Sequence, residues 1–266
     1  MSLKNTSDEA FVLYLEGQQL FSVIDRKDLD AALAKFRAAT SLSPDFARAW
    51  GHIAYCLAQI VVGGHERDRK RAKQLLEEAE GHARTAISLD AGDYANHWDL
   101  AFVLLNLGRG EEAYRAYEHA LALFDRQTDK LDRRNDLLVE MAEAYVYAGN
   151  SDRAFELLDR AVRVPDWYRW IRAWAHFNRR EYKETIAEIT AMRKKCFDAG
   201  YVPDIQLLLA AAYAYIGDNA LAQEALGRLR KARADWDLAS ELARNPFASE
   251  KDRLHWEEGM RRAGFN

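Results

Sequence analysis

The chain has 266 residues, of which 49% are hydrophobic and 30% are charged, proportions that are typical of a folded protein. Its formal net charge of −4 excludes the overall basic excess that general nucleic-acid binders carry. No apolar run approaches the roughly 20 residues that a membrane-spanning helix needs. The first ten residues contain Asp8 and Glu9 and lack the basic region of a signal peptide, so the sequence predicts a cytoplasmic protein with no membrane association.

The composition favours helices over strands. Only four prolines are present, and alanine, leucine, arginine and glutamate, which are strong helix formers, are abundant. Stretches in which Val, Ile or Thr alternate with polar residues are nearly absent. We therefore predict an all-α protein with more than about two-thirds of its residues in helices, against about one-third in an average protein.

Small residues recur at helical spacing along the chain, and a break follows most of these sets. A small residue at a helix crossing lets two helices approach closely, and a larger residue one turn away fills the groove beside it. This pattern predicts the second helix of a helical hairpin at six places. In chain order the sets are Ala32, Phe36 and Ala39; Ala79, Ala83 and Ala86; Ala113, Tyr117 and Ala120; Ala154, Leu158 and Ala161; Thr185, Ile189 and Met192; and Ala222, Leu226 and Leu229.

A helix with its own apolar stripe precedes most of these sets. The stripes span residues 50–57, 97–104, 138–145 and 209–213, with spacings of three and four that place them on one helix face. The last three end at Gly108, Gly149 and Gly217, where a helix C-terminus has to turn. One hairpin cannot bury its apolar face alone, so the hairpins are expected to stack.

These residues resemble the tetratricopeptide repeat family. Residues 30–45 are similar to its second helix and closing turn, and residues 204–218 are similar to its first helix. The resemblance covers residues 10–234 and implies an α-solenoid of about six hairpins in a right-handed superhelix. We expect residues 1–234 to form this array and residues 235–266 to form a C-terminal helical cap.

The sequence departs from the family pattern in spacing. The family repeat is about 34 residues long, whereas the equivalent alanines Ala54, Ala101, Ala142 and Ala173 lie 47, 41 and 31 residues apart. We expect an insertion after Gly63-Gly64 that lengthens the following helix, and a long loop over residues 125–135. The tail from Asn245 to Phe265 is also similar to the end of the repeat regions that follow bacterial class III adenylate cyclase domains, which implies a bacterial regulatory protein.

No motif for chemistry is present. The glycine pairs lack the strand and the Lys-Ser/Thr of a phosphate-binding loop, and no serine lies in a nucleophile elbow. His52 and Cys56 share a helix face, but two ligands do not complete a zinc site. Cys56 and Cys196 stand far apart and indicate two buried thiols rather than a disulfide framework. We predict no enzymatic activity, no catalytic residue, no metal and no cofactor.

In the family, the first helix of each hairpin lines a concave groove. The resemblance therefore implies candidate binding residues on that face: Trp98, Phe102, Asn106, Tyr147, Trp170, Trp174, Phe177 and Asn178. The Trp167, Trp170, Trp174 and Phe177 stripe has helical spacing, which is equally typical of a packed core. Some family members clamp a partner's terminal carboxylate with Lys, Asn and Arg. This sequence has Arg48, Gly51, Tyr55 and Gln59 at the corresponding positions of its second hairpin, so a chaperone tail is not expected.

Two functional hypotheses follow. In the first, the chain is a protein-interaction scaffold that binds a peptide or a helix in the groove through its aromatic residues. In the second, it is a regulatory or oligomerisation module that forms a homodimer or packs on a cyclase-like enzymatic domain absent from this chain.

Overall fold

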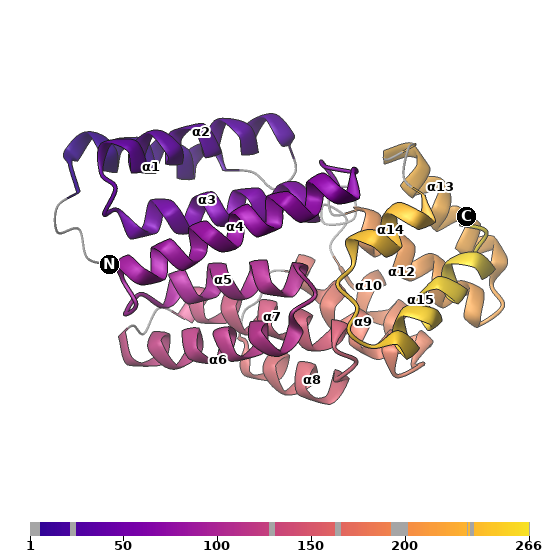
Figure 1. The fold of residues 1–266 in the computed structure, drawn as a ribbon. Coiled ribbons are helices and arrows are strands. Elements are labelled where there is room, and N and C mark those ends of the chain that lie inside the picture. The colour runs from indigo at the N-terminus through magenta and orange to yellow at the C-terminus, as the bar shows by residue number, and fades with distance from the viewer. Residues whose placement is uncertain are drawn as a thin grey trace. The chain divides into compact units, whose positions relative to one another are not determined.

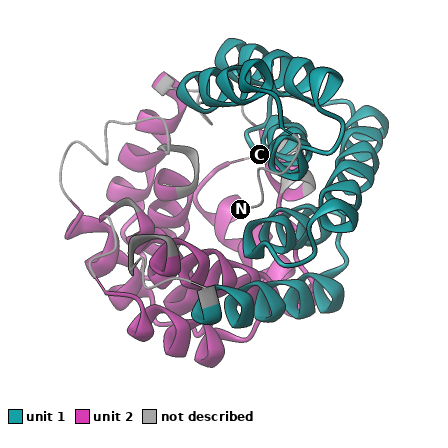
Figure 2. Ribbon diagram, turned by 90° about the vertical axis from the view of Figure 1, so that its left-hand side faces the viewer, with its two compact units in different colours: residues 1–129 teal, residues 130–266 magenta. Residues whose placement is uncertain are grey.

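The computed structural model describes most of the chain, and all regular structure in the described part is helical (Figure 1). The described residues are 6–21, 25–127, 131–162, 166–192, 202–232, 234 and 237–265. They fall into two compact units, residues 1–129 and residues 130–266, which Figure 2 colours separately. The all-α class predicted from composition and periodicity is confirmed.

The first unit contains three hairpins, α1/α2, α3/α4 and α5/α6, and successive hairpins pack on one another through α2, α3 and α5. Its helices are α1 (Asp8–Leu20), α2 (Arg26–Leu42), α3 (Ala47–Val62), α4 (Arg69–Leu89), α5 (Tyr94–Asn106) and α6 (Gly110–Gln127). Most of these helices start at a capping side chain. Asp25, Asp68 and Asp93, for example, each accept a hydrogen bond from a backbone N–H in the first turn of the next helix.

The second unit contains three further hairpins, α7/α8, α9/α10 and α12/α13, followed by two helices at the end of the chain. Its helices are α7 (Leu131–Tyr147), α8 (Ser151–Arg160), the short η1 (Asp166–Tyr168), α9 (Arg169–Asn178), α10 (Tyr182–Thr190), α12 (Val202–Tyr215), α13 (Asn219–Ala232), α14 (Leu238–Arg244) and α15 (Glu250–Arg262). The described residues thus contain the expected six hairpins. The division at residue 234 stays a prediction, since α14 and α15 lie within the second compact unit.

Small residues allow the helices of each hairpin to approach, as predicted. Ala54, Ala101, Ala142 and Ala173 are all completely buried. In the first hairpin the corresponding contact uses Gly17, because a Cβ atom there would lie 2.7 Å from the ring of Phe36. The large side chains then fill the grooves beside these close contacts.

The turn inside five of the six hairpins has one geometry. The residue after each turn donates its N–H to a carbonyl five residues earlier, and the turn residue itself has a positive φ. Four of the five turns use glycine, which adopts this conformation without a steric cost: Gly64, Gly108, Gly149 and Gly217. The turn between α9 and α10 instead uses Arg180, with a φ of 66°. An arginine there costs conformational energy, so its side chain is of interest.

The two expected departures from the family spacing had different outcomes. The predicted long helix of the second hairpin is confirmed, because α4 has 21 residues. It starts at Arg69, after the Asp68 cap, rather than at about Glu66 as expected. The predicted loop over residues 125–135 is wrong. Helix α6 continues to Gln127 and α7 already starts at Leu131, because charged residues in this segment are compatible with an exposed helix face.

Candidate functional site

We call the first helix of each hairpin its A helix. In the first unit, three aromatic rings on or directly after the A helices form a row. Phe21 follows α1, Tyr55 lies on α3 and Phe102 lies on α5. The ring centroids are 5.6 Å apart for Phe21 and Tyr55, and 5.0 Å apart for Tyr55 and Phe102. We call these three residues the aromatic row. It connects three successive hairpins through ring contacts.

Three of the predicted groove residues lie on α5, namely Trp98, Phe102 and Asn106, and Phe102 is itself part of the row. Asn106 is half-buried, and its Nδ2 donates to the carbonyl of Phe102 at 2.9 Å. Trp98 and Phe102 are both largely buried. The structure therefore places Phe102 and Asn106 together, and Trp98 lies one turn earlier on the same helix.

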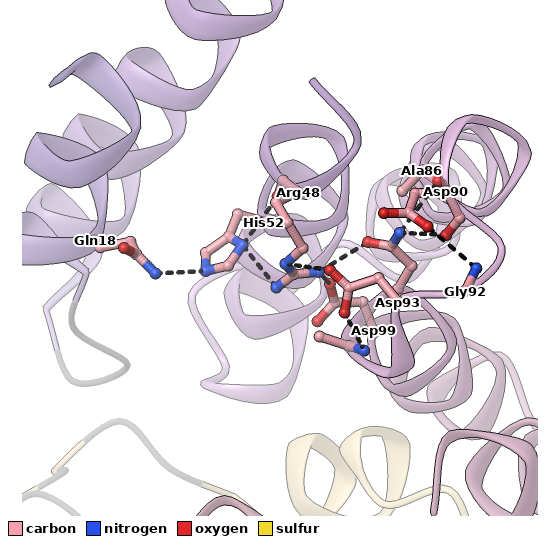
Figure 3. A network of polar contacts seen from close by, with 10 residues as sticks. Gln18, Arg48, His52, Ala86, Asp90, Gly92, Asp93 and Asp99 are labelled. Atoms are coloured by element: carbon pink, nitrogen blue, oxygen red, sulfur yellow. Dashed lines mark hydrogen bonds and ion pairs between the residues drawn. The ribbon is translucent and has the colours of Figure 1, made fainter. Parts of the chain in front are cut away.

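A buried polar network joins α3 to α5 (Figure 3). One Nη atom of Arg48 donates to Asp99 Oδ2 at 2.8 Å and to the side-chain oxygen Oδ1 of Asn96 at 2.9 Å. Asp93 lies 3.9 Å from the Arg48 Nε. Asn96 extends the network by donating to the carbonyls of Ala86 and Asp90 at the end of α4, at 3.2 and 2.9 Å. The network therefore fixes how the second and third hairpins stack.

The charge of Arg48 is held inside this network. Burial disfavours that charge, but Asp99, Tyr14 and Asp93 more than offset the effect and keep the pKa of Arg48 above its ordinary value. The Arg48 side chain is only 12% exposed. Arg48 is consequently engaged with carboxylates of the chain itself.

In the second unit, the chain's own C-terminal helix lies against the A helices. Helix α15 packs on α12 (Figure 1), and Trp256 stacks on Trp174 of α9 with ring centroids 4.8 Å apart and an interplanar angle of 27°. The Phe177 ring contacts the Trp256 indole edge-on, with ring centroids 5.5 Å apart. Trp174, Trp256 and Phe177 are all almost completely buried.

A second group of rings surrounds His255 on α15. The Tyr215 ring stacks on the His255 ring at 4.6 Å and on the Tyr182 ring at 4.6 Å. The hydroxyl of Tyr215 donates to the backbone carbonyl of His255 at 2.9 Å. Beside this stack, the guanidinium of Arg180 donates to Asp252 at 2.9 Å. The strained turn residue thus supplies an ion pair to α15.

Acidification is expected to weaken the docking of α15. Burial, together with Arg180 and Arg262, lowers the pKa of His255 to about 4, while Asp252 and Glu258 partly oppose this shift. When α15 is undocked, the His255 imidazole binds a proton near the ordinary histidine pKa of about 6.5. Docking should therefore be strongest above pH of about 6.5 and weaken as the pH falls towards about 4.

Near-ultraviolet circular dichroism, which reports the packed tryptophans, measures this change. His255→Phe keeps a neutral ring against Tyr182, Tyr215 and Phe177 and should flatten the pH dependence. An identical pH profile in the two proteins would contradict the assignment to His255.

The segment before α15 is bound by backbone and side chains of α7. The Ala248 N–H donates to the carbonyl of Tyr147 at 3.0 Å, and the Tyr147 hydroxyl donates to Asn245 Oδ1 at 2.8 Å. The Phe247 ring lies edge-on to Tyr147 at 5.7 Å. The chain thus holds one of its own extended segments as a groove would hold a peptide.

These contacts place the remaining predicted groove residues. Tyr147, Trp174 and Phe177 converge on the C-terminal segment, and Asn178 is buried and donates its amide to the carbonyl of Val146 at 2.9 Å. Trp170 is half-buried, with its ring 5.7 Å from Trp174. The side chain of Trp167 lies outside the described residues. A role of these residues in binding a partner stays a prediction, and in this structure their neighbour is the C-terminal segment.

Sequence reasoning predicted Phe102 but missed Phe21 and Tyr55 of the aromatic row, and it missed the role of Trp256. Tyr55 was noted only as a departure from the carboxylate clamp, and Phe21 follows the last turn of its helix, where periodicity carries no signal. Trp256 and Gly259 lie three residues apart, which could have indicated a helix that approaches another closely. Nothing in the sequence pattern indicates which face that helix covers.

The candidate residues for chemistry are placed as follows. Burial raises the pKa of Cys56 to about 12, so its thiol stays protonated and is a poor nucleophile. Cys196 lies outside the described residues. Within the described part of the chain, no three His, Cys, Asp or Glu side chains come together as a metal site. Among the helices described, none is both long and apolar enough to span a membrane.

Comparisons with known proteins bear on the fold. Residues 93–165 match the tetratricopeptide repeat. No curated protein matches the sequence significantly. PilF from Pseudomonas aeruginosa is similar in structure, with a TM-score of 0.55 and 16% identity over 86% of this chain and 94% of that chain.

A tetratricopeptide repeat protein from Parabacteroides merdae is also similar, with a TM-score of 0.51 and 17% identity over 97% of this chain and 90% of that chain. Similarity at such low identity concerns the fold alone. Residues 93–165 are therefore tetratricopeptide repeats, and the chain has the all-α helical-hairpin fold of tetratricopeptide repeat proteins.

Proposed function

We propose that the chain is a non-catalytic interaction scaffold whose first unit binds a peptide or helix of a partner protein across α1, α3 and α5. The aromatic row carries this proposal, because Phe21, Tyr55 and Phe102 place one ring from each of three successive hairpins in contact with the next. Aromatic rings are the commonest anchors of protein interfaces, since they supply large contact areas with few rotatable bonds.

Two features of the first unit support this role. Asn106 lies next to Phe102 and supplies an amide that pairs with the backbone of an extended ligand. The network around Arg48 holds α3 and α5 in a fixed register, so that Tyr55 and Phe102 are positioned before a ligand arrives. Such preorganisation lowers the entropic cost of binding.

Replacing Tyr55 with alanine is expected to weaken binding of a partner peptide by at least about 10-fold, because the central ring of the row is removed. The ligand for this test is a peptide selected on the wild-type chain from a random library, and calorimetry gives its affinity. Tyr114→Ala is the matched control, since Tyr114 is also half-buried but lies on α6, the second helix of its hairpin. Equal affinities for Tyr55→Ala and the wild type would contradict the proposal.

A second candidate function is packing against another copy of the chain or against a further domain, as the similarity to cyclase-linked repeats suggests. It is supported by α1, where Val12 and Leu15 are exposed apolar residues one turn apart. Light scattering separates the two functions. A dimer that Val12→Glu dissociates favours the second candidate, and a concentration-independent monomer favours the first.

A further inference from the structure

We propose that α15 is a displaceable internal ligand, and that the face it covers on α9 and α12 is a second binding site. The site would accept a partner helix that presents an indole and, three residues later, a glycine. This inference concerns the second unit and does not depend on binding at the aromatic row.

The contacts of α15 define that recognition pattern. Trp256 is fully buried and stacks on Trp174 at 4.8 Å. A Cβ atom on Gly259 would lie 2.9 Å from both the Ala211 Cβ and the Tyr215 ring, so α12 and α15 touch where only glycine fits. An indole that fills the hollow beside Trp174 and a glycine that permits close approach are therefore the two requirements on any helix at this site.

The position of α15 allows it to leave. The hairpins α7/α8, α9/α10 and α12/α13 each pack within themselves and against neighbouring hairpins without it. Helix α15 follows the segment from Asn245 to Ser249, which contains no helix. Its release would uncover the face on α9 and α12 while the hairpins keep their own contacts. Proteins open locally in cooperative units without unfolding as a whole.

The docked state also leaves two donors unused. The indole N–H groups of Trp174 and Trp256 are buried and have no acceptor among the described residues. An unpaired buried donor is costly, so the interface with α15 is not optimal. A partner helix with a hydrogen-bond acceptor beside its indole would satisfy the N–H of Trp174 and that of its own indole. Such a helix would compete with α15. The partner we infer is thus an amphipathic helix with a tryptophan, a glycine three residues later and a neighbouring polar acceptor.

The polar contacts at the start of α15 are specific to the docked helix. Arg180 keeps a positive φ and donates to Asp252. In four of the chain's other hairpins the residue at this turn is glycine, which carries no side chain to make such a contact. Arg180 therefore ties the turn of the fifth hairpin to the presence of a carboxylate on the bound helix.

The test uses the full-length chain and a fluorescein-labelled synthetic peptide of residues 245–265. In the wild-type protein α15 competes with the peptide. The apparent affinity for the peptide is therefore reduced in proportion to the small fraction of molecules in which α15 is released. Trp256→Ala in the protein weakens the docking of α15. The wild-type peptide should therefore bind this variant at least about 10-fold more tightly than it binds the wild-type protein. Leu254→Ala is the control, because Leu254 is 51% exposed on α15 and should leave the affinity unchanged.

A second variant and a second peptide make the result decisive. Gly259→Ala in the protein drives α15 away from Ala211 and should raise peptide affinity in the same way. A peptide that carries Trp256→Ala should bind neither variant. If the wild-type peptide binds Trp256→Ala and Gly259→Ala no better than the wild type, the proposal is overturned. Loss of far-ultraviolet helicity in both variants overturns it as well, because a displaceable ligand leaves the hairpins folded.

Discussion

Replacing Trp174 with alanine is expected to destabilise the second unit by about 3–5 kcal/mol, the loss that follows truncation of a fully buried tryptophan. The indole of Trp174 is 1% exposed. Its ring contacts those of Tyr147, Trp170, Phe247 and Trp256 at centroid distances between 4.8 and 6.0 Å. The truncation removes the residue on which the C-terminal segment packs. Urea unfolding followed by circular dichroism measures the free energy of unfolding.

Trp170→Ala is the matched control for this prediction. Trp170 has the same side chain on the same helix but is half-buried, so its truncation should cost only about 1–2 kcal/mol. Small and equal losses in both variants would contradict the structure, since they would mean that Trp174 is a solvent-exposed groove residue.

Replacing Arg48 with methionine is expected to destabilise the first unit by about 3–5 kcal/mol, because it leaves buried carboxylates without their countercharge. The Asp99 carboxylate accepts a hydrogen bond from the Arg48 guanidinium at 2.8 Å. Asp93 is buried beside it. Methionine keeps the length and apolar volume of the side chain, so the loss reports the charge rather than a cavity. Thermal unfolding gives the change in stability.

Arg26→Met provides the comparison. Arg26 pairs with Asp30 at 2.9 Å on the exposed surface of α2, and exposed pairs contribute at most about 1 kcal/mol. Similar effects of Arg48→Met and Arg26→Met would show that the Arg48 network is solvated and does not fix the packing of α3 on α5.

The hairpins could be predicted from the sequence because their causes are local. Small residues at spacings of three and four mark the helix crossings, and glycines mark the turns, so the first and second helices of most hairpins follow directly from Ala54, Ala101 and Gly149 and their equivalents. The fifth turn escapes this reasoning. Arg180 occupies a conformation that favours glycine, and its side chain pairs with Asp252, which lies 72 residues away and which no local pattern connects to it.

The candidate site could be predicted only in part. Periodicity places Trp174 and Phe177 on one helix face, but a stripe at helical spacing is the same whether it faces solvent, a partner or another segment of the chain. The contact between Trp174 and Trp256 joins residues that are far apart in sequence, and no local pattern encodes it. The same limit applies to the aromatic row, whose rings come from three separate hairpins.

Hydrogen–deuterium exchange of the unmodified chain tests most directly whether α15 is docked as a ligand. The amides of residues 250–262 should exchange faster than those of residues 171–177 and 205–214, because α15 opens without unfolding α9 and α12. Exchange of all three segments at one common rate would contradict the account, since α15 would then be an inseparable part of the folded core.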